Sequence, residues 1–191
     1  MLFQPAVRAI PMRRAFLLAL AFVFAARRAA DPFAAELPLP GEPALLRADL
    51  PGSRDRVAAS SRVFASLSVR GQVAFVVLRT AKVFTSSVVG NGRPSPHAVA
   101  FRILLTESHG AEAFRELMAA SPYAPRLYGL AGVYLLDPAL FAAHAHDFQS
   151  DDSPVQTFVG CAFVLKPANQ VVLGIASGDW PSDLARKRPG A

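Results

Sequence analysis

The stretch that decides the fold is Arg126-Leu-Tyr-Gly-Leu-Ala-Gly-Val-Tyr-Leu-Leu136. From Leu127 onward it is apolar on nearly every side of a helix, and a helix of that kind is buried all round in a folded domain. We therefore expect the helix over 127–136 to be the central one. Gly129 and Gly132 lie three residues apart on it, which allows a neighbouring helix to approach closely, whereas the run is too short for a transmembrane packing motif.

Helix-start signals stand on both sides of this stretch. Asp137-Pro138 combines a capping side chain with a proline at the first helical position, and it predicts a helix to about Phe148. Ser95-Pro96 repeats this combination and predicts a helix through about Glu107. Between the two, apolar residues recur at helical spacing over 111–118. Because the connections are short, we expect successive helices to run antiparallel as hairpins.

Farther from the centre the patterns are weaker. A moderate apolar stripe predicts a helix over 56–68. Residues 72–89 are rich in apolar and β-branched side chains, and their periodicity does not separate a strand from a buried helix. Val155 to Leu165 predicts a strand or a buried extended segment, and Pro167 to Ser177 predicts a last helix on which Trp180 folds back.

These elements define the expected fold class. It is mainly α, a small bundle of antiparallel helix hairpins with one or two short strands. The hairpins are loosely similar in architecture to HEAT-type repeats. The chain contains no repeat of fixed period, so this likeness assigns no family.

The N-terminal segment has the layout of an export signal. Met12-Arg13-Arg14 precedes an apolar core from Ala15 to Ala26, and small residues at its end predict cleavage after Ala25. The core is shorter than the ~20 residues needed to cross a bilayer, so we expect no stable transmembrane span in the mature chain. The arginine pair partly matches the twin-arginine motif. The general secretory route, an uncleaved anchor, a mitochondrial presequence and a start at Met12 stay open as alternatives.

Proline and charge indicate the remaining organisation. We expect a signal peptide over 1–25 and a proline-rich linker over 26–53, which holds five prolines. A helical domain over 54–181 and a basic flexible tail over 182–191 follow. The expected location is outside the cytoplasm, either periplasmic or secreted.

The composition excludes several classes of protein. Among 191 residues, 52% are hydrophobic, which excludes a chain disordered through low hydrophobicity. The formal charge is +6, but cleavage after Ala25 would lower it to +3, and no dense basic run remains in the middle of the chain. We therefore expect no nucleic-acid partner. Cys161 is the only cysteine, so no intrachain disulfide forms, and its apolar neighbours predict a buried, inert thiol.

The most suggestive group of chemically active side chains is His144, His146, Asp147, Asp151 and Asp152. On a helix, the two histidines point to nearly opposite faces, whereas His144, Asp147 and Asp151 share one face and could hold a divalent ion. However, the sequence from Ser150 to Pro154 favours a turn that ends the helix and pulls Asp151 off that face. We therefore interpret the group as a solvated helix end and assign no metal ligand.

The other polar residues carry no catalytic signature. We expect His109 near a helix C-terminus and His97 exposed in the first turn of its helix. Glu112 and Glu116, one turn apart with Arg115 beside them, predict a solvated surface. The sequence has neither a Gly-x-Ser-x-Gly elbow nor a phosphate-binding loop, so we assign no catalytic or cofactor-binding residue.

Three functional hypotheses follow. The first is an exported helical interaction or binding module without catalysis, whose partner is a protein or another envelope component. The second is a metal-dependent hydrolase that uses the His/Asp group near 144–152. The third is a carrier of a small apolar ligand, held in a cavity between helices.

Overall fold

The computed structural model describes residues 52–90 and 92–186. The expected signal peptide, nearly all of the expected linker and residues 187–191 of the expected tail lie outside these ranges. Eight α-helices make up most of the described chain, which confirms a mainly helical protein. They are accompanied by a four-stranded sheet.

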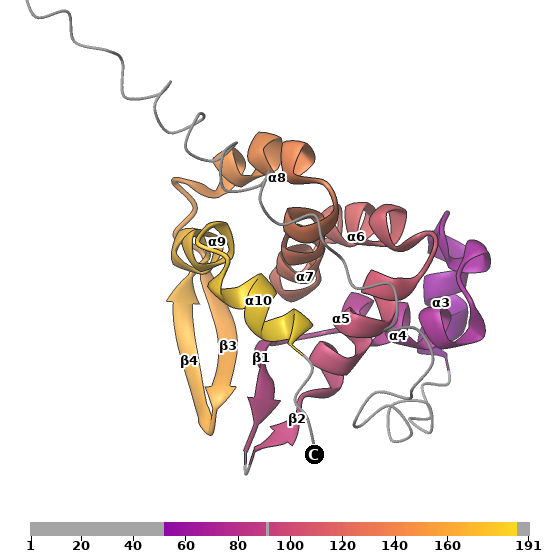
Figure 1. Ribbon diagram of the computed structural model, residues 1–191, viewed down its shortest axis with the longest axis horizontal. Coiled ribbons are helices and arrows are strands. Elements are labelled where there is room, and N and C mark those ends of the chain that lie inside the picture. Colours follow the sequence, from indigo (N-terminus) through magenta and orange to yellow (C-terminus); the bar gives the residue numbers. More distant parts are fainter. Residues whose placement is uncertain (1–51, 91, 187–191) are drawn as a thin grey trace, which may run out of the picture. The chain divides into compact units, whose positions relative to one another are not determined.

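The elements alternate between helical and extended segments along the chain (Figure 1). The helices are α3 (Ser53–Ser60), α4 (Val69–Arg79), α5 (Pro96–Thr106), α6 (Gly110–Met118), α7 (Tyr123–Leu136), α8 (Pro138–Ala145), α9 (Ala168–Ala176) and α10 (Asp179–Ala185). Two short 3-10 helices are η1 (Phe64–Ser66) and η2 (His146–Phe148). The strands are β1 (Phe84–Val89), β2 (Arg93–Pro94), β3 (Pro154–Gly160) and β4 (Ala162–Pro167).

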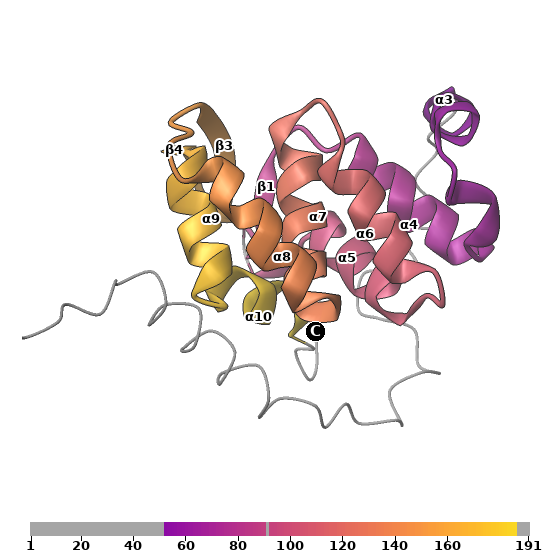
Figure 2. The same cartoon turned by 90° about the horizontal axis from the view of Figure 1, so that it is seen from above.

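Helix α7 is the central helix, as expected. Its residues from Ala124 to Tyr134 are buried apart from Arg126, whose side chain is also buried in large part, and α6 and α8 pack on either side of it (Figure 2). The two glycines face α6. A Cβ atom added at Gly129 would lie 2.5 Å from the backbone nitrogen of Met118, and one added at Gly132 would overlap the ring of Phe114. The glycine spacing therefore serves close packing of two helices.

The two expected caps are both present. The Ser95 hydroxyl accepts a hydrogen bond from the Ala98 N–H at 3.5 Å at the start of α5. Asp137 Oδ1 accepts one from the Leu140 N–H at 3.2 Å at the start of α8. In both cases a proline follows the cap. At this first helical position an N–H has no acceptor within the helix, so proline, which lacks an N–H, costs no hydrogen bond.

The expectation of one or two strands was wrong. The sheet has the order β2-β1-β3-β4, in which β1 pairs parallel with β3 and the two outer pairs are antiparallel. Helices α5 to α8 form the crossover that a parallel pair requires. Local periodicity does not reveal the sheet, because β2 has only two residues and the β1–β3 pairing joins distant parts of the chain.

The ambiguous segment over 72–89 divides into both kinds of structure. Its first part belongs to α4, and its second part forms β1. The expected helix over 56–68 is interrupted: α3 ends at Ser60, and the Ser61 hydroxyl accepts a hydrogen bond from the Phe64 N–H in the next turn. The helix expected to reach Phe148 ends as α8 at Ala145 and continues as η2.

The last helix, α10, crosses the expected domain end at residue 181. Leu184 is fully buried, so residues 182–185 belong to the packed structure. The side chain of Trp180, in α10, packs against α9, because a Cβ atom added at Gly174 would lie 2.7 Å from the indole. The centroids of the Trp180 and Phe84 rings are 4.8 Å apart. The expected contact of Trp180 with the preceding helix is confirmed.

Candidate functional site

The most unusual surface of the described chain is the β3–β4 hairpin. Gly160 and Cys161 form its two-residue turn, and Gly160 has a φ of 58°, a conformation that favours glycine. A glycine with positive φ at the first of two turn residues is the pattern of the type II′ turn, whose twist suits an antiparallel hairpin. The turn therefore divides one apolar run of sequence into two strands.

The pairing register assigns the hairpin side chains to two faces. Val155 and Thr157 of β3 are buried, and their partners on β4 are Lys166 and Val164. Because side chains alternate along a strand, Phe158 and its partner Phe163 project from the opposite face. Their rings are stacked, with centroids 4.1 Å apart and an angle of 9° between the planes.

Strand β4 is apolar and exposed. Phe163 is 61% exposed and Leu165 is 70% exposed, and Val159 and Val164 are each about two-fifths exposed. Phe163 and Leu165 project from one face of the hairpin and Val159 and Val164 from the other, and we call these four residues together the apolar hairpin surface. Leu173 of α9, which packs beside β4, is 68% exposed. Single exposed apolar residues are common, but a run of them on one strand marks a contact site or an aggregation hazard.

The two edges of the sheet differ in how they are protected. At one edge, β2 has two residues, Arg93 and Pro94, and a short strand with a charge and a proline is a poor template for further pairing. At the other edge, β4 has six residues, a single charge at Lys166 and a proline only at its end. In both views β4 lies at the opposite end of the domain from α3 (Figures 1 and 2).

The expectation of a buried thiol at Cys161 was wrong. The residue is exposed, and its thiol lies 3.1 Å from the carbonyl oxygen of Gly90. The apolar neighbours that suggested burial belong to the exposed hairpin, so hydrophobic sequence and burial do not coincide here.

A second group of polar side chains is buried around β1. The hydroxyl of Thr85 lies 2.6 Å from that of Ser95 and 3.1 Å from that of Tyr128, and the Thr85 N–H donates to the Tyr128 oxygen at 2.8 Å. Burial raises the pKa of Tyr128 well above its usual value. These hydroxyls satisfy one another, so the group is a structural network that fixes β1 to α5 and α7.

His97 is not exposed, contrary to expectation. Its ring stacks on Tyr128 with centroids 5.7 Å apart, and burial lowers its pKa to about 4. Within the described residues its buried Nδ1 has no hydrogen-bond partner. His97 therefore acts as a neutral aromatic ring beside the hydroxyl network.

The C-terminal helix is held by a carboxylate. Asp183 accepts hydrogen bonds from the N–H and the hydroxyl of Ser87 at 2.7 and 2.8 Å. The buried guanidinium of Arg102 donates to the carbonyl oxygens of Leu184 and Arg186 at 3.4 Å. Burial lowers the pKa of Arg102, and the nearby charge of Asp183 opposes this shift.

The His/Asp group of the hydrolase hypothesis does not converge. His144 Nδ1 and Asp147 Oδ2 are 3.6 Å apart, with side chains 48% and 65% exposed. Asp151 turns away, as the expected turn predicts, and accepts hydrogen bonds from the Ser153 N–H and the Tyr123 hydroxyl. Hydrogen bonding from the Ser153 side chain, followed by that from Tyr123, lowers the pKa of Asp151. Over residues 52–90 and 92–186, no three His, Cys, Asp or Glu residues are grouped so as to hold a metal ion.

One other polar residue differs from expectation. Glu116 does not belong to a solvated surface, because its carboxylate accepts hydrogen bonds from the N–H groups of Arg62 and Val63. His109 is exposed and lies near the C-terminus of α5, which ends at Thr106, as expected, and it is also the N-cap residue of α6.

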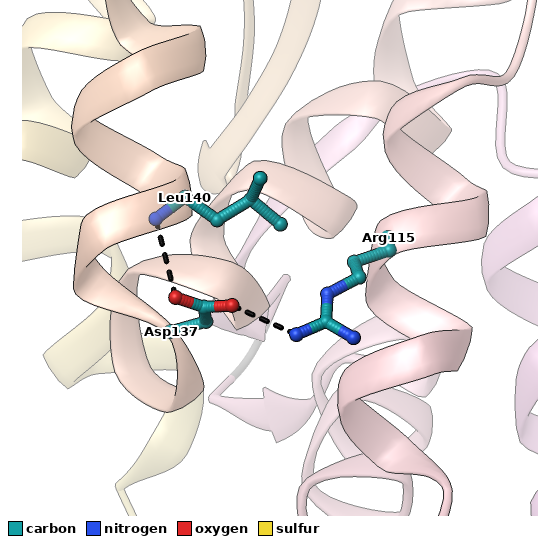
Figure 3. Close-up of polar contacts among 3 residues, drawn as sticks. All are labelled: Arg115, Asp137 and Leu140. Atoms are coloured by element: carbon teal, nitrogen blue, oxygen red, sulfur yellow. Dashed lines mark hydrogen bonds and ion pairs between the residues drawn. The ribbon is translucent and has the colours of Figure 1, made fainter.

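Arg115 joins α6 to the start of α8. Its guanidinium donates to Asp137 Oδ2 at 2.8 Å, while Oδ1 of the same carboxylate caps the helix (Figure 3). The Arg115 hydrogen bond, followed by that of Leu140, lowers the pKa of Asp137. This contact is structural, because each of the two carboxylate oxygens of Asp137 accepts one of these hydrogen bonds (Figure 3).

No protein-family model, curated protein or solved structure matches this chain. Among the described helices, none combines the length and the apolar character that a membrane crossing needs.

The candidate surface that sequence reasoning missed is the β4 edge. Gly160-Cys161 between two apolar runs was the available signal, since Gly-X is a two-residue hairpin turn. Reading that turn would have shown that Phe163 and Leu165 belong to a second strand. The exposure of that strand depends on the order of the sheet, which the local sequence does not contain.

Proposed function

We propose that this chain is an exported binding module without a catalytic role, and that it contacts a partner protein through the apolar hairpin surface. One observation carries the proposal: an apolar edge strand whose residues Ala162 to Leu165 are all exposed. The carboxylates of Glu116, Asp137, Asp151 and Asp183 and the hydroxyls of Thr85, Ser95 and Tyr128 are engaged in structural hydrogen bonds. Within the described residues, the hairpin carries exposed apolar side chains and an open strand edge that a partner can cover.

The energetics favour a partner that covers the apolar hairpin surface over leaving this surface in water. Covering an exposed Phe or Leu side chain gains roughly 1.5–3 kcal/mol for full burial. An unpaired apolar edge is also a hazard that sheets normally suppress with charge, proline or a covering element. The β2 edge of this sheet has such protection, and the β4 edge lacks it except at Lys166 and Pro167.

Site-specific photo-crosslinking in the producing cells tests the proposal. A photoreactive phenylalanine analogue replaces Phe163 in one sample and Val69 in the control. Val69 is 70% exposed and lies in α4, outside the hairpin. We expect a covalent adduct of defined mass from position 163 and none from position 69. If position 163 gives no adduct at native expression level, the proposed binding function is wrong.

Export forms the other half of the proposal. It is supported by the arginine pair and apolar core over 13–26 and by the small residues at the end of the core. Cell fractionation with N-terminal sequencing tests it. We expect a mature N-terminus at Ala26 outside the cytoplasm, and an intact Met1 or Met12 in the cytosol would refute the export step alone.

A further inference from the structure

We infer that the partner of the apolar hairpin surface is a second copy of this chain, joined through antiparallel pairing of β4 with β4 about a two-fold axis at Val164. This inference rests on the proposed function and names its partner. The result is one continuous sheet that runs through both copies. This pairing has one defined register, which follows from the backbone groups that β4 already uses in its pairing with β3.

The first step is to find which backbone groups of β4 are free. In a hairpin with a two-residue turn, the residues that flank the turn exchange hydrogen bonds, and bonded and non-bonded pairs then alternate. The flanking pair is Val159 with Ala162, so Val164 and Lys166 also bond toward β3. The N–H and C=O groups of Phe163 and Leu165 therefore point to the open edge.

The second step is to match this edge with itself. With Val164 opposite Val164, Phe163 of each copy lies opposite Leu165 of the other. Both residues present an N–H and a C=O, so two complete pairs form, with four hydrogen bonds. If the axis moved to Leu165, Phe163 would face Pro167, which has no N–H. If it moved to Phe163, Leu165 would face Cys161 in the turn.

The side chains favour the same register. Opposed residues of a strand pair project from the same face, so Phe163 of one copy packs on Leu165 of the other twice over. These are the two most exposed large apolar residues of β4. The pairing therefore covers the apolar hairpin surface where it is most exposed.

The charges also suit a second copy. Lys166, the single charge on β4, lies opposite Ala162 in this register. The two lysines are then four residues apart along the strands, about 14 Å at ~3.4 Å per residue. That separation exceeds the Debye length of about 8 Å at physiological ionic strength, so they repel little. An axis at Lys166 would place them directly opposite each other, which is unfavourable.

A disulfide placed at the axis tests the register directly. In the C161S background, the variant V164C puts a thiol opposite its own copy in a non-bonded pair, where Cα atoms are ~4.5 Å apart and a disulfide can close. The matched control C161S/L165C puts the thiol opposite Phe163. Under a mild oxidant, we expect a covalent dimer from the first variant and little from the second.

Light scattering during gel filtration tests the assembly itself on the whole chain as isolated from the producing cells. We expect a mass twice that of the monomer. L165P removes an outward N–H without touching the bonds to β3, so the fold is kept and dimerisation weakens by roughly tenfold or more. Far-UV circular dichroism checks the fold. F163K should weaken the dimer too, and F163K/L165E should restore it, because the lysine then faces a glutamate of the other copy.

The outcomes separate this inference from the proposed function. A monomer at high micromolar concentration, or a dimer that L165P and F163K leave unchanged, overturns the β4 pairing. If the wild-type chain is monomeric and photo-crosslinking at position 163 captures a different protein, the second copy is wrong and the binding function stands. A monomer without any crosslink refutes both.

Discussion

His97 shows how partial burial makes a titratable residue behave as a neutral aromatic ring. Its stacking on Tyr128 needs only the ring, and a charge there would be desolvated without a compensating partner among the described residues. Burial lowers the pKa of His97 to about 4, against 6.5 for the ordinary side chain. The unfolded chain therefore binds more protons than the folded chain between these two values.

The stability should accordingly fall as the pH is lowered through that window. The contribution of His97 is fully present above pH 6.5 and lost progressively toward pH 4. Between pH 7.5 and 5.0 we expect the free energy of unfolding, measured with urea, to drop by roughly 2 kcal/mol. His97→Phe should remove this drop, whereas His144→Phe, at an exposed side chain, should keep it. The same slope in wild type and His97→Phe would contradict the assignment.

Asp137 combines a helix cap with an ion pair, and substitutions separate the two. Asn caps a helix about as well as Asp does, so Asp137→Asn removes mainly the charge contact with Arg115. Exposed ion pairs contribute little, so Asp137→Asn and Arg115→Ala should both lower the melting temperature only slightly. Asp137→Ala loses the cap as well and should lower it most. Equal effects of all three variants would show that the cap is not what Asp137 provides.

At the scale of elements, the contact between α6 and α7 depends on glycine. A Cβ atom at Gly129 would lie 2.5 Å from the Met118 nitrogen and 2.7 Å from the Phe114 carbonyl oxygen, and backbone cannot move aside as a side chain can. This opposes the intrinsic preference of helices for Ala, about 1 kcal/mol. The steric effect prevails, because the crowded atoms belong to the backbone of a packed helix.

Gly129→Ala should therefore lower the free energy of unfolding by roughly 1–3 kcal/mol, which is the usual range for overpacking. Gly71→Ala in α4 is the matched control. There the added Cβ atom meets the carboxylate end of Glu107, which can swing away at the expense of its hydrogen bonds to Ser68. Urea unfolding should show the smaller loss for Gly71→Ala. A neutral or stabilising Gly129→Ala would mean that the two helices separate without cost.

Elements with local signals could be predicted from the sequence, and elements that depend on distant pairing could not. The apolar run over 127–136 and the caps at Ser95 and Asp137 identified α5, α7 and α8, because each signal lies within one helix. The segment over 72–89 stayed ambiguous because the extended form of β1 depends on its pairing with β2 and with β3, which is distant in the sequence. The exposure of the apolar hairpin surface was missed for the same reason: the sheet order makes β4 an edge.

At the scale of the whole described domain, Asp183 joins the C-terminal helix to the start of the sheet. Its two bonds to Ser87 connect α10 to β1 across most of the described sequence, and Arg102 supports the same helix from α5. Trp180, the single tryptophan of the chain, lies in α10 against Phe84. Its fluorescence therefore reports whether α10 is docked.

Asp183→Ala should remove two hydrogen bonds to a charged acceptor, together with a charge that favours the buried Arg102, and lower the free energy of unfolding by roughly 1.5–3 kcal/mol. Because the lost contacts are those that join α10 to β1 and α5, the Trp180 fluorescence should change at lower urea than the far-UV circular dichroism, so the helix undocks before the domain unfolds. Asp179→Ala, which removes an exposed contact with Ser177, should keep the two transitions coincident. If they also coincide in Asp183→Ala at an unchanged midpoint, the carboxylate does not hold the helix, and the packing of Leu184 and Trp180 is sufficient.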